Sequence, residues 1–314
     1  MTQRVSERRL SSDSGVARVR SVLVPVDLTA IADRVLGRVA LLPLADDARV
    51  TLLHVVPGSL PVREQRRAER DARKALAEEV RHLRGQIHRK IRIEARVEVG
   101  AAAKQIAACA AEAKAELIVM GRGGGRALRE TFLGSTAERV LRRTRRPVLV
   151  VRLAARKPYS RPALALDLNQ AAHEIIRVLL LLLPPLRPRL DVIHAFDLPY
   201  NSLVYPSLSG IDALERQSEL RTHATVKLRK LLATALANAN IRPEHAPLWN
   251  TYVRHGSPYG VVRKIVDRSD TDLLVLGTQG FSGAAYVFLG SISGELLRDA
   301  KCDVLVVPPT PARA

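Results

Sequence analysis

Residues 121–135 could bind an anion. This stretch, GRGGGRALRETFLGS, follows the apolar run 117–120, which predicts a buried strand, and precedes residues 136–143, which predict a helix. Glycine tolerates positive φ and lets a ligand approach the backbone closely. Free N–H groups at a helix start attract anions, and we expect Ser135 to cap that helix. A phosphate group is the anion that such an arrangement fits.

The same arrangement occurs a second time. Nine residues separate Gly124 from Gly134, and nine separate Gly280 from Gly290; a second apolar run, 273–276, precedes the second copy. Other pairs repeat as well: Asp27 with Asp167 and His54 with His194 at a separation of 140, and Gly100 with Gly256, Gly121 with Gly277 and Gly134 with Gly290 at a separation of 156. The sequence therefore predicts an internal duplication with 16 extra residues in the second copy. We place them in a loop at 197–210, which is rich in Pro, Ser and Tyr.

Five strands must alternate with four helices to position these glycines. Apolar runs predict strands at 21–26, 50–56, 91–99, 117–120 and 147–151, and amphipathic or Ala-rich stretches predict helices at 28–42, 61–84, 101–113 and 135–143. The pattern restarts at 163. We predict an α/β fold of two repeated five-stranded parallel-sheet domains with helices on both faces, at 20–154 and 155–314, after a disordered tail at 1–19. Ligands bind such sheets at the carboxyl ends of strands, where Asp27 and Gly121 both fall.

Composition narrows the class of protein. The chain has 314 residues, 50 Lys and Arg against 31 Asp and Glu, and two cysteines, one in each half. So few cysteines argue against a disulfide framework and for a reducing compartment. No apolar stretch is long enough to span a bilayer, so we expect a soluble cytoplasmic protein without a transmembrane segment. The net charge of +19 fits a solvated Arg-rich surface better than nucleic-acid binding, because there is no helix-turn-helix signature and aromatic residues make up 4%.

These motifs together resemble the universal stress protein family. The resemblance rests on VPVD at 24–27, LHVV at 53–56, LIVMG at 117–121, the G-x2-G-x9-G-[ST] spacing and PVLVV at 147–151, and it covers nearly the whole chain in tandem. It implies strand order 3-2-1-4-5. It also implies the branch of the family that keeps the glycine loop and binds ATP, rather than the branch that has lost both.

The resemblance also implies contacts for each residue of a nucleotide site. In the first half, Asp27 after Pro25 would contact the ribose, the backbone of Val55 would read the adenine edge, and Met120 would pack on the base. The phosphate cradle would be Gly121, Gly124, Gly134, Ser135 and the N–H of Thr136. In the second half the same places fall to Asp167, Ala195, Leu276, Gly277, Gly280, Gly290, Ser291 and Ile292.

The second half departs from the family pattern. It lacks a proline equivalent to Pro25, and no Lys or Arg lies between Gly277 and Gly290, whereas the first loop carries Arg122, Arg126 and Arg129. We therefore expect tighter triphosphate binding in the first half. The second site could hold ATP, another ligand or nothing.

Catalysis has little support in the sequence. There is no Gly-Lys-Ser/Thr motif for γ-phosphate transfer, and no motif places a histidine–carboxylate pair as a general base. Ser135 could bind Mg²⁺ together with phosphates. We expect slow ATP hydrolysis at most, and we interpret ATP as a conformational ligand of a stress or energy sensor that acts through an unknown protein partner. The alternative is a non-enzymatic scaffold whose basic surface binds an acidic protein, nucleic acid or a lipid head group.

Two structural interpretations remain. His54 and His194 lie inside apolar strands, where hydrogen-bonded core histidines are more common than metal ligands. Family members often pair their fifth strands across a two-fold axis, so residues 148–151 could pair with 304–307 within this one chain. The chain would then imitate a dimer of single domains, and a further homodimer stays open.

Overall fold

The computed structural model describes residues 18–29, 31–123, 134–169, 171–184, 187–196, 210–241, 243–278 and 290–309. Most of the predicted N-terminal tail therefore lies outside the described residues, and the first strand begins at Val19.

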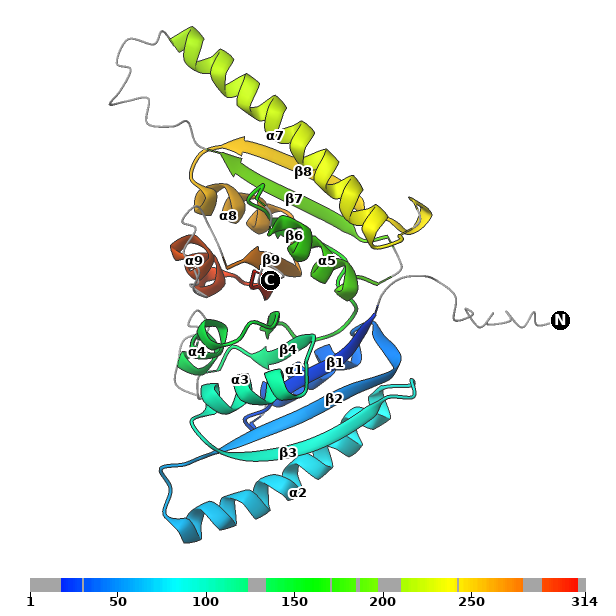
Figure 1. Cartoon of the computed structure of the whole chain (residues 1–314), viewed down its shortest axis with the longest axis vertical. Coiled ribbons are helices and arrows are strands. Elements are labelled where there is room, and N and C mark those ends of the chain that lie inside the picture. Colours follow the sequence, from blue (N-terminus) through cyan, green and yellow to red (C-terminus); the bar gives the residue numbers. More distant parts are fainter. Residues whose placement is uncertain are drawn as a thin grey trace, which may run out of the picture.

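The described residues contain ten strands that form one sheet, in the order β3-β2-β1-β4-β5-β10-β9-β6-β7-β8 (Figure 1). Within each half all pairs are parallel, and the order is 3-2-1-4-5 when strands are counted from that half's own first strand. The predicted α/β fold with two repeated parallel halves is confirmed. The strands are β1 (Val19–Pro25), β2 (Leu44–Pro57), β3 (Arg92–Gly100), β4 (Leu117–Gly121), β5 (Val148–Val151), β6 (Pro162–Ala165), β7 (Arg189–Phe196), β8 (Leu248–His255), β9 (Leu273–Gly277) and β10 (Asp303–Val307).

The two halves join through their fifth strands. β10 pairs antiparallel with β5, with Leu305 opposite Leu149. This pairing within the chain was predicted, and it is confirmed. Both strands are almost wholly buried, because each has a neighbour on both sides and helices above and below.

Helices cover both faces of the sheet. One face carries α1 (Ile31–Ala40), α2 (Val62–Gln86), α5 (Ala172–Leu182) and α7 (Gly210–Asn238), and the other carries α3 (Ala102–Glu112), α4 (Ser135–Arg143), α8 (Pro258–Arg268) and α9 (Ser291–Asp299). The strands alternate between these layers: Val22 and Val24 pack with the first group and Leu23 with the second. Runs that are apolar at every position are typical of parallel strands buried on both faces. In Figure 1 the two longest helices, α2 and α7, lie at opposite ends of the molecule beside β3 and β8.

The extra residues of the second half do not all lie in the predicted loop. α7 has 29 residues where α2 has 25, and the 3₁₀ helix η1 (Pro243–His245) occupies the connection from α7 to β8. Residues 197–209 lie outside the described residues, and Gly210 already belongs to α7. Part of the insertion therefore lengthens a helix and its exit.

The glycine loops close in the same way in both halves. The N–H of Gly134 donates to the carbonyl of Arg122 at 2.7 Å, and that of Gly290 donates to the carbonyl of Thr278 at 3.2 Å. A Cβ on Gly134 would lie 2.6 Å from the carbonyl carbon of Gly123, closer than any side chain tolerates. Two segments of backbone therefore touch where each loop begins and ends.

This contact makes one sequence prediction wrong. Ser135 was expected to cap α4, but the N-cap residue is Gly134, no side chain caps the helix, and Ser135 is its first residue. The cap position must lie against the backbone of Gly123, which leaves no room for the side chain of a serine.

A buried carboxylate joins the linker to both halves. Asp303 is 0% exposed at the start of β10, and its Oδ1 accepts the N–H groups of Arg152 at 2.7 Å and Leu153 at 2.8 Å. Its Oδ2 accepts the hydroxyl of Tyr159 at 2.7 Å and lies 3.1 Å from Nε of Arg38. Burial, followed by the charge of Asp303, raises the pKa of Tyr159 well above its ordinary value. The hydroxyl thus stays protonated and donates.

Removing that carboxylate should destabilise the protein strongly. Asp303→Ala leaves the charge of Arg38, which is 4% exposed, without a counter-ion, together with two backbone N–H groups without acceptors. Breaking one side of a buried pair costs about 3–5 kcal/mol, so urea denaturation should show a fall of that size in the free energy of unfolding.

The control is Asp270→Ala. Asp270 pairs with Arg161 at 2.8 Å but is 85% exposed, so its loss should change stability by about 1 kcal/mol or less. Equal losses for the two variants would show that the Asp303 cluster contributes no more than a surface pair.

The glycine contact makes a second stability prediction. Gly134→Ala must push the backbone of Gly123 away, and such overpacking costs about 1–3 kcal/mol. Gly85→Ala is the matched control, because Gly85 lies near the end of α2 and a Cβ there meets nothing within 4 Å. Alanine should stabilise that helix by about 0.5–1 kcal/mol. Shifts of the same sign in urea denaturation would contradict this account.

Candidate functional site

The first pocket lies at the carboxyl ends of β1 and β4. It is a cleft of about 770 Å³ that includes its mouth to solvent. Six of the predicted site residues line it: Pro25, Asp27, Val55, Met120, Gly121 and Thr136. The fold thus brings together residues from four elements and the turn after β1, because parallel strands end at one edge of the sheet.

Asp27 holds the turn that follows β1. Its Oδ1 accepts the N–H of Thr29 at 3.1 Å and the hydroxyl of Thr29 at 2.7 Å. The intervening Leu28 has φ of +56°, a region that few non-glycine residues adopt. Among the described residues none donates to Oδ2 of Asp27, so this oxygen can accept a hydrogen bond from a ligand.

Glycine backbone forms part of the wall of this pocket. Gly121 and Gly123 line the pocket, and Gly123 has φ of +68°. By helix geometry, the N–H groups of Ser135, Thr136 and Ala137 have no carbonyl acceptor within α4. Thr136 lines the pocket, so the start of α4 lies at its edge.

Two members of the predicted phosphate cradle, Gly134 and Ser135, do not line this pocket. The N–H of Gly134 is taken by the carbonyl of Arg122, so it serves loop closure. Ser135 is exposed and is not among the lining residues. Gly124 lies outside the described residues.

In each half, a histidine of the second strand binds the backbone next to the aspartate of the pocket. Nδ1 of His54 lies 2.9 Å from the carbonyl oxygen of Val26, and Nδ1 of His194 lies 2.9 Å from that of Leu166. A carbonyl can only accept, so Nδ1 carries the proton in both rings. The predicted structural role of both histidines is confirmed. Each ring ties the second strand to the residue just before the aspartate.

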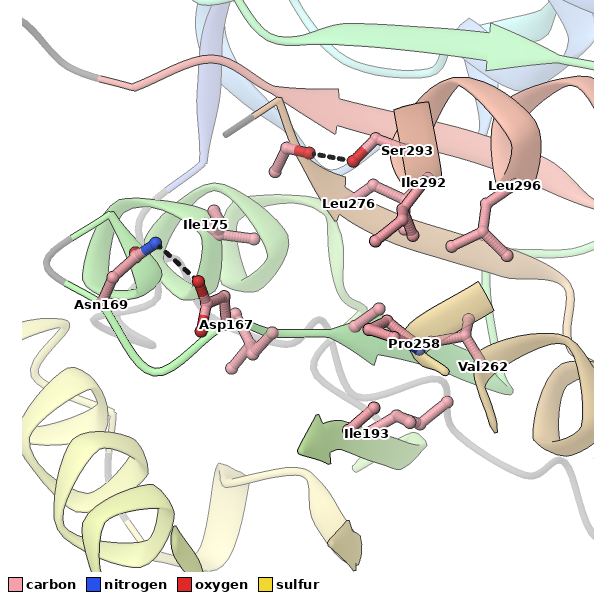
Figure 2. A pocket seen from close by; sticks show the side chains of 14 residues that line it. Asp167, Asn169, Ile175, Ile193, Pro258, Val262, Leu276, Ile292, Ser293 and Leu296 are labelled. Carbon is pink, nitrogen blue, oxygen red and sulfur yellow. Dashed lines mark hydrogen bonds between the residues drawn. The ribbon is translucent and has the colours of Figure 1, made fainter. Parts of the chain in front are cut away.

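The second pocket occupies the equivalent place, with a cleft of about 660 Å³ (Figure 2). Five predicted residues line it: Asp167, Ala195, Leu276, Gly277 and Ile292. Gly290 and Ser291 do not line it, and Gly280 lies outside the described residues. Figure 2 shows the hydroxyl of Ser293 reaching the carbonyl of Gly277, at 2.8 Å, and the amide of Asn169 reaching Asp167, at 3.3 Å.

The lining residues that escaped the sequence prediction include Gly123, Asn169 and Ser293. Gly123 belongs to the run of three glycines at 123–125, which marks it as a backbone contact. Asn169 stands two residues after Asp167, within the turn that an Asp side chain commonly forms with the backbone two residues on. Ser293 had no signal, because its first-half equivalent is Ala137.

Three further features concern metal-binding groups, cysteines and membrane-spanning helices. No group of three or more His, Cys, Asp or Glu within the described ranges could hold a metal ion. Both cysteines are free and buried, and desolvation raises the pKa of Cys302 to about 12. Across the part of the chain that the structure describes, no helix combines the length and apolar character needed to cross a bilayer.

Comparison with known proteins identifies the fold and the repeat. The model of the universal stress protein family matches residues 18–152 and again residues 163–308. The universal stress protein Sll1388 of Synechocystis is 29% identical over 157 residues, which cover 48% of this chain and 97% of that protein.

Solved structures of universal stress proteins have a similar fold. A universal stress protein from Archaeoglobus fulgidus superposes with a TM-score of 0.63 at 16% identity, covering 94% of this chain and 98% of its own. A putative universal stress protein from Pseudomonas aeruginosa gives 0.56 at 18% identity, covering 93% and 94%. At these identities the likeness concerns the fold alone. Since the family model matches both halves, this chain belongs to the universal stress protein family, as a tandem member.

Proposed function

We propose that the chain binds ATP in the first pocket and works as a regulator whose conformation depends on that nucleotide. The observation that carries the proposal is the set of groups that share this cleft. A carboxylate, an apolar thioether, glycine backbone and the start of a helix lie together in it.

The cleft suits the parts of a nucleotide in order. Its lining combines apolar side chains with a few polar groups, as small-molecule sites do. Met120 and the end of β2 at Val55 offer an apolar slot with backbone polar groups for a base. Oδ2 of Asp27 can accept a ribose hydroxyl, and the N-terminal N–H groups of α4 can receive phosphate oxygens. The triphosphate of bound ATP would then lie at the N-terminus of α4.

A regulatory role fits the place of α1 in the structure. Ala32 and Val35 of α1 line the pocket, and Arg38 of the same helix pairs with Asp303 of the second half. A ligand that binds one position of α1 better than another would therefore bias the junction between the halves. An unknown protein partner, Mg²⁺ near Ser135 and hydrolysis that is slow at most remain part of the proposal.

The test is ATP affinity with one aspartate removed at a time. Asp27→Ala removes a charged hydrogen-bond acceptor worth about 1.5–3 kcal/mol, so titration calorimetry should show a loss of affinity of about 10- to 100-fold. Asp167→Ala is the matched control in the second half, and it should leave ATP affinity unchanged. Absence of ATP binding by the unaltered chain, or equal effects of the two variants, would contradict the proposal.

One observation favours a second candidate function, a scaffold that binds polyanions. Five basic side chains lie along the solvent face of α2, opposite its buried residues Ala72, Leu76 and Leu83. They are Arg63, Arg67, Arg70, Lys74 and Arg81, spaced three, four or seven residues apart. Such spacing aligns side chains on one face of a helix. An anionic partner would meet a mainly basic face, on which Arg67 and Arg81 also pair with Asp71 and Glu78 of the same helix.

Binding to a duplex DNA oligonucleotide measures this second candidate. The triple variant Arg70→Glu, Lys74→Glu and Arg81→Glu should weaken binding at low salt at least about tenfold and flatten its salt dependence, because fewer counterions are released. The control carries Arg216→Glu, Arg221→Glu and Lys227→Glu on exposed positions of α7. Equal weakening by both triple variants would leave only net charge as the cause. If ATP abolishes DNA binding, the anion-binding site is instead the first pocket.

A further inference from the structure

The two pockets are built at equivalent positions, so each difference between them reports a difference in ligand. Thr136 at the start of α4 is replaced by Ile292 at the start of α9, and both line their pockets. Figure 2 shows the Ile292 side chain beside those of Leu276 and Leu296. An apolar side chain therefore lies at the edge where the first pocket offers a hydroxyl.

The backbone that would face a phosphate is also covered. Cδ1 of Ile175 lies 2.8 Å from the position that a Cβ on Gly277 would take, so this side chain fills the space that the glycine opens. The equivalent residue in the first half is Val35, which is shorter. The hydroxyl of Ser293 donates to the carbonyl of Gly277, so this donor is not available to a ligand.

The carboxylate of the second pocket is less exposed than that of the first. Each pocket has a single charged side chain among its described lining residues, but Asp167 is half-buried, whereas Asp27 is exposed. Its carboxylate receives a 3.3 Å hydrogen bond from Asn169 on Oδ2, and no described residue donates to Oδ1. A carboxylate among apolar side chains repels phosphate and needs a donor.

We propose that the second pocket binds an uncharged apolar small molecule that carries one hydrogen-bond donor, such as an aromatic amine or alcohol, and that it does not hold a nucleotide. The donor meets Oδ1 of Asp167, and the apolar body lies among Ile175, Ile193, Val262, Leu276 and Ile292. The lining of the cleft combines apolar walls with few polar groups, as small-molecule sites do. This inference does not depend on ATP binding in the first pocket.

The test uses the full chain and the fluorescent probe N-phenyl-1-naphthylamine, an apolar aromatic with a single N–H donor. We expect saturable binding of one equivalent, seen as increased emission. Ile292→Asp places a second carboxylate in the pocket and should abolish the signal. Thr136→Asp is the matched change in the first pocket and should preserve it. Asp167→Ala should weaken binding about tenfold, the loss of one charge-assisted hydrogen bond.

Two further measurements keep the inference falsifiable. Circular dichroism and thermal unfolding of Ile292→Asp must match those of the unaltered chain. If they do not match, the test rests on probe binding by Asp167→Ala alone. Loss of the probe in Thr136→Asp but not in Ile292→Asp would overturn the inference. So would a full equivalent of ATP bound by the Asp27→Ala chain and displaced by the probe. A chain that binds the probe as expected but no ATP would refute the nucleotide proposal and leave this one standing.

Discussion

Main-chain pairing between β5 and β10 is the constraint on which this architecture depends. A parallel five-stranded sheet with helices on both faces still leaves its last strand with unpaired N–H and C=O groups on one side, and such an edge invites uncontrolled association. Here each half covers the edge of the other, and the residues of both strands are almost wholly buried. The inner strands that carry the two pockets are therefore supported from both sides.

The two halves share the backbone features that position their pockets and differ in the side chains that line them. Both halves keep the histidine that binds the carbonyl before the aspartate, the hydrogen bond that closes the glycine loop, and a glycine at positive φ after the third strand, at Gly100 and Gly256. These features fix where strands end, and a change in any of them would move several elements at once. Side chains that only line a cleft have no such role, which leaves their chemistry free to diverge.

The sequence predicted the features that repeat or alternate. Runs such as 117–120 are apolar throughout, which is the pattern of a strand buried on both faces, and the spacing of Asp27, His54 and the glycines in the two halves revealed the duplication. The residues that converge on the first pocket followed from strand ends and from the family resemblance. Their predicted contacts with a nucleotide remain predictions.

The features that the sequence missed depend on contacts between distant segments. Ser135 looked like a cap, because serine is common there, and only the approach of Gly123 to Gly134 shows why glycine takes that place. Arg38 lies in the predicted helix at 28–42, and no sequence pattern singles it out, yet it is buried against a carboxylate far along the chain. No local pattern reports such partners.

Asp303 has a consequence for the independence of the two repeats. The carboxylate belongs to the last strand of the second repeat, but its donors are a helix of the first repeat and the linker. A second repeat produced without residues 18–154 would leave this buried carboxylate without Arg38 and without the N–H groups of Arg152 and Leu153, and a first repeat produced alone would leave Arg38 without its anion. Each repeat therefore depends on the other for part of its stability.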